Sequence, residues 1–168
     1  MKKQWLYFLL VFLLPVIGIF WWWGAFATVT VETAQRGPYH YAYMEFTEDY
    51  AKLPDNQQEV IHEFQLQNIT RGAAINLLLD DPRTTPRKEQ AARIGFLVEP
   101  GVMVRAPLKL GDVPARTVVM ARVRAHPRLA PGKVYAALLQ YLKEHGMKFT
   151  LPTVEIYQNS EMTVEMAV

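Results

Sequence analysis

Hydrophobic and polar positions divide the chain into one long apolar run and a longer region of short alternating segments. Residues 5–27 carry no charged or amide side chain. As a helix this run rises about 35 Å, enough to cover a bilayer core of about 30 Å. Trp5 lies at one end and Trp21, Trp22 and Trp23 at the other, and aromatic rings favour the two membrane interfaces. The pattern therefore predicts one transmembrane helix over 5–27 after a short head of residues 1–4.

The charges beside this run predict its orientation. Lys2 and Lys3 precede the run, and only Arg36 follows it closely, so the positive-inside rule leaves the head in the cytoplasm. The expected location is the inner (cytoplasmic) membrane, single-pass, with the domain on the periplasmic or extracytoplasmic side. A cleaved signal peptide is the alternative, because residues 25–27 form a small-x-small site. The length of the run and its tryptophans favour an uncleaved signal anchor.

The rest of the chain alternates between the two common periodicities. A helix is predicted over 54–67, with Pro54 in its first turn, and a second over 131–145. The second helix has an apolar stripe that includes Val134 and Leu138, and Gly146 ends it. Alternation of apolar and polar positions predicts strands over 28–34, 39–46, 74–79, 92–98, 102–108, 116–124, 153–157 and 161–166.

The order of these elements repeats. A strand, a helix and two further strands occur twice, once in module one (about 28–99) and once in module two (about 113–168). The period is too long for a solenoid and is typical of a duplicated module. We therefore expect an α+β domain over 28–168, built as one antiparallel sheet with two helices on one face.

Charge and composition narrow the classes of partner. The chain has 168 residues with 18 Lys and Arg against 16 Asp and Glu, and the two lysines of the head account for the whole excess. A nucleic-acid partner would need a clustered basic footprint, so none is expected. Arg122, Arg124, His126 and Arg128 form a short basic stripe that we interpret as a solvated edge.

The residue types also argue against several catalytic chemistries. The chain has no cysteine, which excludes disulfides and thiol nucleophiles. Its four histidines have no metal-ligand spacing, so neither a metal nor another cofactor is expected. Ser160 is the only serine, which argues against a Ser–His–Asp triad. Asp80 and Asp81 precede Pro82 and are interpreted as turn-shaping residues.

Four segments, in this order along the chain, carry a family resemblance. They are Glu48-Asp49-Tyr50, the stretch 80–86 with the Arg-Ile-Gly of 93–95, the Val-Pro-Ala-Arg of 113–116, and the Val-Glu-Ile-Tyr of 154–157. Together they resemble the GyrI-like small-molecule-binding family, although Glu48 stands where many members have glycine. The resemblance implies two strand-helix-strand-strand modules with a ligand cleft between them, and membrane-anchored members occur.

Glu155 is the principal candidate for binding. Along 153–157 the period of two places Glu155 and Tyr157 on one strand face. A carboxylate beside aromatic rings suits a flat cation through charge pairing and cation–π attraction. The resemblance implies that Glu155 is the family's cleft carboxylate. From the residues alone, the alternative is a solvated edge-strand glutamate.

Three further tyrosines are candidate ligand-binding residues. Tyr41 lies between Tyr39 and Tyr43 on one face of a predicted strand, and this face is either a wall of the cleft or a packed sheet face. Tyr50 stands at the family's Gly-x-Tyr position. Tyr141 belongs to the apolar stripe of the second helix, whereas Tyr135 lies off that stripe and is a candidate to face the cleft.

These observations favour a membrane-anchored domain that captures amphipathic or cationic aromatic small molecules. One alternative is a hydrolase of strained electrophilic toxins that uses Glu155 as a general base. The other is a protein-interaction module with no small ligand and an unidentified protein partner. The sequence does not show whether the protein is an enzyme, and binding without turnover is the preferred interpretation.

Overall fold

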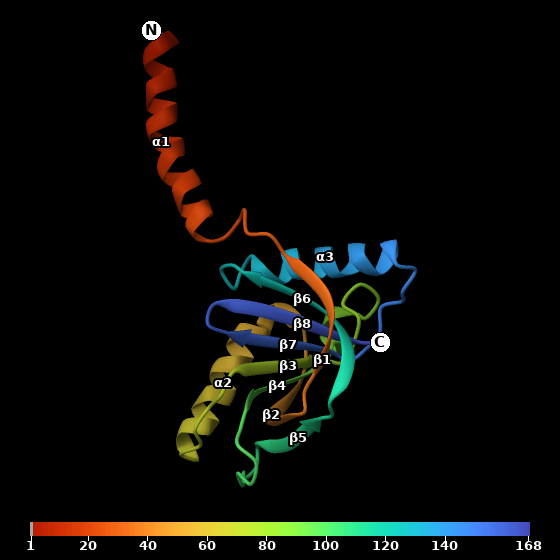
Figure 1. Ribbon diagram of the computed structural model, residues 1–168. Helices are drawn as coiled ribbons and strands as arrows, with labels where there is room; N and C mark the ends of the chain where they lie inside the picture. The colour runs from red at the N-terminus through yellow and green to blue at the C-terminus, as the bar shows by residue number, and fades with distance from the viewer. Residues whose placement is uncertain (1) are drawn as a thin grey trace.

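The computed structural model describes residues 2–168, apart from the side chains of residues 2–4 and 6, as one eight-stranded antiparallel sheet with two helices packed on it (Figure 1). The helices are α1 (Lys2–Trp22), α2 (Leu53–Leu66) and α3 (Ala130–Glu144). The strands are β1 (Thr30–Arg36), β2 (Tyr39–Thr47), β3 (Ala74–Leu78), β4 (Ala91–Leu97), β5 (Lys109–Val113), β6 (Arg116–Arg124), β7 (Thr153–Gln158) and β8 (Glu161–Ala167). The predicted α+β class is confirmed.

One predicted strand is wrong. The segment 102–108 was expected to be extended and paired, but the strand in this region is β5, which begins only at Lys109. Pro107 has no N–H to donate to a ladder. Leu108 is buried against the core under α2, whereas Met103 is 90% exposed. The alternation therefore reflects loop residues that insert side chains into the core without pairing their backbone.

The predicted transmembrane helix over 5–27 is also corrected. α1 ends at Trp22, and residues 23–26 form a turn. The apolar part of α1, from residue 5 to 22, rises roughly 27 Å, less than a bilayer core of about 30 Å. Within the described part of the chain, no helix meets both the length and the apolarity needed to cross a membrane. The single-pass inner-membrane location that rested on this span is withdrawn with it.

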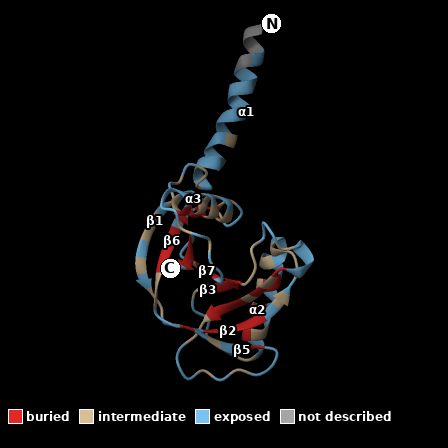
Figure 2. Ribbon diagram, turned by 90° about the vertical axis from the view of Figure 1, so that its right-hand side faces the viewer, coloured by how far each residue is buried: buried red, intermediate tan, exposed pale blue. Residues whose placement is uncertain are grey.

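The end of α1 is fixed to the domain by polar and aromatic contacts. The Trp23 ring stacks on the His126 ring with centroids 4.6 Å apart, and the backbone N–H of His126 donates to the backbone carbonyl of Trp23 at 2.8 Å. The Lys133 ammonium group donates to the carbonyls of Gly24 and Ala25 at 3.0 and 2.6 Å. α1 itself extends away from the sheet, and most of its described side chains are exposed (Figure 2).

The strand order shows how the two halves of the domain sequence combine in one sheet. The order is β1-β6-β8-β7-β3-β4-β2-β5, so the halves meet at the central pair β7 and β3. The first half of the domain sequence contains β1–β4 and α2, and the second half contains β5–β8 and α3; β5 precedes the predicted start of module two. β1 pairs with β6 of the second half, and β5 pairs with β2 of the first half. The first strand of each half therefore pairs with the other half.

Two short connections force this sheet to curl. Gly37 and Pro38 alone join β1, at one edge, to β2, next to the other edge. Three peptide links span at most about 11 Å, so opposite ends of the sheet must approach each other here. A Cβ on Gly37 would lie 3.0 Å from the Pro114 carbonyl oxygen, in the connection between β5 and β6, and Gly37 has a φ of +85° that favours glycine. The two connections are therefore in contact.

A buried carboxylate holds the curled ends together. Glu165 on β8 is 0% exposed. It accepts hydrogen bonds from Arg36 Nε at 2.7 Å, from the Tyr39 hydroxyl at 2.7 Å and from Arg116 Nη2 at 3.1 Å. Because these donors come from β1, β2 and β6, the network joins both modules on the face of the sheet opposite α2 and α3.

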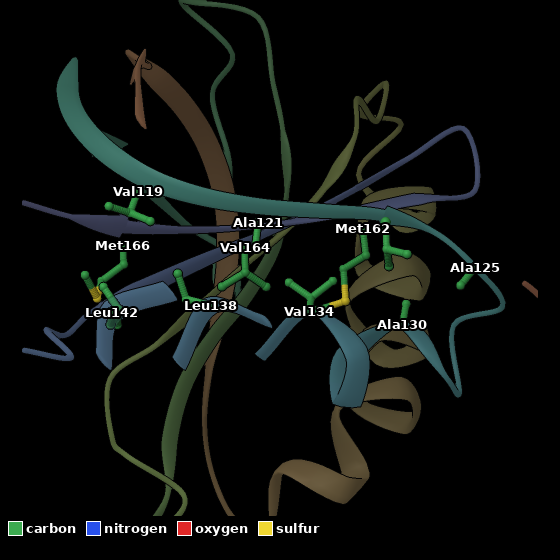
Figure 3. Packing of buried hydrophobic residues seen from close by; sticks show 11 residues of the cluster. Val119, Ala121, Ala125, Ala130, Val134, Leu138, Leu142, Met162, Val164 and Met166 are labelled. Carbon is green, nitrogen blue, oxygen red and sulfur yellow. The ribbon is translucent and has the colours of Figure 1, made fainter. Parts of the chain in front are cut away.

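Both helices pack on the same face of the sheet, as predicted. Val134, Leu138 and Leu142 of α3 point at Val164 and other apolar residues of β6 and β8 (Figure 3). α2 covers β4 and β2 through Val60 and Phe64, both 0% exposed. The central strands β7 and β3 lie between these two hydrophobic clusters.

Candidate functional site

A polar pair occupies the middle of the helix-covered face. Cross-strand register aligns Val164 with Glu155, Glu155 with Asn76, and Asn76 with Ile94. Residues directly opposite each other on neighbouring strands share a face. Val164 packs under α3 and Ile94 under α2. Glu155 and Asn76 therefore lie between the two helices, flanked on either side by apolar packing.

The Glu155 carboxylate accepts hydrogen bonds from three neutral side chains. The Tyr135 hydroxyl donates to Oε1 at 2.9 Å, and the Tyr157 hydroxyl donates to Oε2 at 3.1 Å. Asn76 Nδ2 lies 3.5 Å from Oε2. Tyr135 also bonds the Thr153 hydroxyl at 3.2 Å. α3, β7 and β3 each contribute to this arrangement, so tertiary packing fixes the orientation of the carboxylate.

Burial controls the protonation of these groups. Glu155 is 3% exposed. Desolvation raises its pKa above the ordinary value, and the hydrogen bonds from Tyr135, Tyr157 and Asn76 oppose that rise. Desolvation, together with the neighbouring carboxylate, also raises the pKa of both tyrosines, so they remain proton donors. The result is a carboxylate whose charge is poorly solvated.

The site has acceptor capacity without a matching cation. Within the described part of the chain, no basic side chain pairs with Glu155. The Asn76 Oδ1 atom is buried and has no hydrogen-bond partner. Buried acceptors without donors cost free energy. Both groups would gain from a ligand that brings a positive charge or an N–H or O–H group.

A pocket of about 680 Å³ opens above this pair. Its lining comes from both modules and is mainly apolar and aromatic. The lining residues are Tyr50, Ala51, Leu53, Pro54, Gln57, Ala74, Asn76, Leu78, Asp81, Pro82, Arg83, Pro127, Arg128, Pro131, Tyr135, Leu139, Phe149, Glu155 and Tyr157.

Four of the five residues singled out in the sequence line this pocket: Glu155, Tyr157, Tyr50 and Tyr135. The Tyr50 hydroxyl donates to the Ala91 carbonyl at 2.8 Å, which holds its ring in the wall. Tyr41 is elsewhere. It is 1% exposed and packs with Tyr43 on the opposite face of the sheet, so we leave it out of the proposed site.

The loop after β3 forms part of the rim. Asp81 accepts from the Arg83 backbone N–H at 2.9 Å and pairs with the Arg83 guanidinium at 2.6 Å. Asp80 Oδ2 accepts from the Ala91 N–H at 2.8 Å. The turn-shaping role predicted for the two aspartates is confirmed. Arg83 also stacks over the Phe149 ring, with its guanidinium carbon 4.9 Å from the ring centroid.

Asn76 and Phe149 were not identified from the sequence. Asn76 is the one polar residue of β3, whose other members are apolar. A lone amide in a buried strand is a usable signal, because it needs a partner. Phe149 lies in an irregular segment after α3, where no periodicity indicates which way a ring points.

The comparison with known families agrees with this geometry. The family model of the GyrI-like small molecule binding domain matches residues 29–167. The chain belongs to this family. The resemblance noted in the sequence is thereby confirmed for the GyrI-like domain.

Solved structures share the fold of this GyrI-like domain. One EcmrR chain in a complex with DNA is 13% identical, with a TM-score of 0.65 over 99% of this chain and 68% of that chain. The EcmrR C-terminal domain is 14% identical, with a TM-score of 0.62 over 83% and 96%. SAV2435 bound to tetraphenylphosphonium is 10% identical, with a TM-score of 0.60 over 83% and 93%. The curated proteins contained no match.

Proposed function

We propose that this GyrI-like domain binds amphipathic cationic aromatic compounds in the pocket between α2 and α3. In this proposal Glu155 pairs with the positive charge, and Tyr50, Tyr135 and Tyr157 form aromatic walls around it. The site residues predicted from the sequence keep these roles, except Tyr41.

The buried, cation-free carboxylate is the observation that carries the proposal. A carboxylate with the burial of Glu155 costs free energy unless it is paired. Three neutral donors lower that cost without neutralising the charge. An entering cation would supply the missing charge, and the low local dielectric would strengthen the attraction.

The pocket's size and walls favour a drug-sized aromatic ligand. Small-molecule pockets range over about 300–1,000 Å³, and this one measures about 680 Å³. Apolar side chains such as Leu53, Leu78 and Leu139 favour an apolar body. Aromatic faces near the charge add about 0.5–2 kcal/mol of cation–π attraction. SAV2435, which shares the fold, is bound to tetraphenylphosphonium, a lipophilic aromatic cation.

A matched pair of ligands tests the proposal. Tetraphenylphosphonium should bind the full chain with one-to-one stoichiometry in a calorimetric titration. Triphenylphosphine oxide, a neutral compound with three phenyl rings in place of four, should bind at least tenfold more weakly. Equal affinity for both compounds would show that charge pairing plays no part, and no binding of either would remove the proposed ligand class.

A turnover assay and the same titration together separate the alternatives. A hydrolase would convert a strained electrophile catalytically, so mass spectrometry would find more product than protein. A protein-interaction module would bind neither small molecule, although the open pocket favours a small ligand. The absence of a nucleic-acid partner stays a prediction, because one protein of this fold is in a complex with DNA.

A further inference from the structure

A second cavity lies on the face of the sheet that carries no helix. It measures about 280 Å³ and borders β1, β6, β7 and β8. Ile156 contributes to its wall, whereas the adjacent residues Glu155 and Tyr157 line the larger pocket. Successive residues of a strand point to opposite faces. The two cavities are therefore separated by the thickness of one sheet and share no lining residue.

Polar and positively charged side chains line this second cavity. Arg36, Arg122 and Arg124 line it, together with the Gln158 and Asn159 amides and the Thr163 hydroxyl. Guanidinium groups are donors without acceptor capacity, and both amides and the hydroxyl offer further donors. Arg36 comes from the end of β1 and the other two arginines come from β6, which pairs with β1, so this grouping is absent from any single segment of the chain.

The positive charges are only partly balanced. Arg36 pairs with Glu165 at 2.7 Å, and Arg122 pairs with Glu32 at 3.4 Å. Arg124 forms no ion pair among the residues described. Glu161 lies opposite Arg124 in the ladder and is the one carboxylate in the lining. Arg116 shares Glu165 with Arg36, so four arginines face three carboxylates here and an excess positive charge remains. Glu161 lowers the attraction of the cavity for anions.

We propose that this cavity binds a small oxyanion, such as inorganic phosphate or the phosphate group of a small ester. Arginine forks match the geometry of phosphate oxygens. Asn159 and Ser160 form the tip of the β7–β8 hairpin and have the positive φ values of a tight two-residue turn. This tip contributes Asn159 to the lining of the cavity. In this proposal Arg122 and Arg124, two of the four residues of the basic stripe, belong to a binding site instead of a solvated edge.

Two substitutions test the site, one that removes a positive charge and one that removes a negative charge. Inorganic phosphate is titrated into the full chain at constant ionic strength, and backbone amide shifts are followed by NMR. We expect saturable shifts in the β7–β8 hairpin. Arg124→Gln should weaken binding about tenfold, the effect of one charge-assisted contact, and Glu161→Gln should tighten it. Arg105→Gln removes the same charge from an exposed loop elsewhere and should leave binding unchanged.

Other outcomes would overturn the proposal. Non-saturable shifts, or equal effects of Arg124→Gln and Arg105→Gln, would indicate general ionic screening. Binding of a short DNA duplex that depends on Arg124, without binding of inorganic phosphate, would indicate a nucleic-acid surface instead. Arg122→Gln is a second variant in case Arg124→Gln does not fold. Glu155→Gln should leave phosphate binding intact, so failure of the cation site and failure of this site are distinguishable.

Discussion

Replacing Glu155 with glutamine tests the cation site most directly. Glu155→Gln keeps the size and planar shape of the side chain but removes the negative charge. The side-chain oxygen of glutamine can still accept a hydrogen bond from the Tyr135 hydroxyl, which now lies 2.9 Å from Oε1 of Glu155. The amide nitrogen replaces an acceptor at the Tyr157 position, where the distance is now 3.1 Å. The geometry is preserved and one acceptor is lost.

The size of the effect follows from burial and charge. At 3% exposure the Glu155 carboxylate is shielded from solvent, so a bound cation interacts with it at reduced dielectric. Hydrogen bonds and pairs that involve a charged group contribute about 1.5–3 kcal/mol net. Loss of that amount weakens cation binding by roughly 10- to 150-fold. A neutral ligand of the same outline should lose much less.

Stability should change in the opposite direction. Desolvation raises the pKa of Glu155 in the folded protein. A group with a raised folded pKa stabilises the protein below its unfolded pKa, and that contribution is lost as pH rises through the folded pKa. Glutamine has no such dependence. At pH 7.5 the Glu155→Gln variant should therefore unfold at a higher temperature than the parent, and the difference should shrink toward pH 4.

Calorimetry with tetraphenylphosphonium and thermal unfolding of the full chain give both readouts. Glu99→Gln is the matched control, because it makes the same change at an exposed carboxylate outside the pocket. Parent-like affinity in Glu155→Gln would refute the assignment of the cleft carboxylate. A lower unfolding temperature in this variant at pH 7.5 would refute the interpretation that the charge is a cost to the folded state.

Three further predictions follow from the same structure. Tetraphenylphosphonium affinity, measured by calorimetry, should fall as pH drops through the raised pKa of Glu155, so the loss should occur at a higher pH than for an ordinary glutamate; a flat profile would contradict ionic pairing. In chemical denaturation, Gly95→Ala should show no stable folded state, because the added Cβ would collide with the backbone of β2. By contrast, the Cβ of Gly132→Ala in α3 meets open space, and this variant should stabilise the folded protein by roughly 0.5–1 kcal/mol. Glu165→Gln should destabilise the folded protein by about 3 kcal/mol in the same assay, because Arg36 and Arg116 lose their buried ion-pair partner. Parent-like stability would contradict this role of Glu165.

Local patterns in the sequence determined most of the secondary structure. The alternation over 116–124 matches β6 residue for residue, and the apolar stripe that includes Val134 and Leu138 became the face of α3 that packs on the sheet. These predictions succeeded because burial on one face imposes a period of two or 3.6 on neighbouring residues. The same local view failed at the N-terminus, where hydrophobicity alone does not locate the turn over residues 23–26 that shortens the apolar helix.

The candidate site was predictable in part. A strand period placed Glu155 and Tyr157 on one face, and the structure brings both to the pocket. The period could not say whether that face meets solvent or another element. That depended on β7 lying in the centre of the sheet, between strands that are covered by α2 and α3. Tyr41 shows the same limit: its strand pattern is equally regular, but the structure buries it on the opposite face of the sheet.

Tertiary structure alone decided how distant segments meet. β1 and β5 each pair with the other half of the domain sequence, and two short connections curl the sheet. Together these features bring Arg36, Tyr39 and Arg116 to Glu165. Asn76 meets Glu155 only through the pairing of β3 with β7. The sequence by itself determined which residues form strands and helices, because those preferences depend on near neighbours. Strand order, curvature and the two cavities depend on contacts between residues far apart in the chain, which a local pattern does not encode.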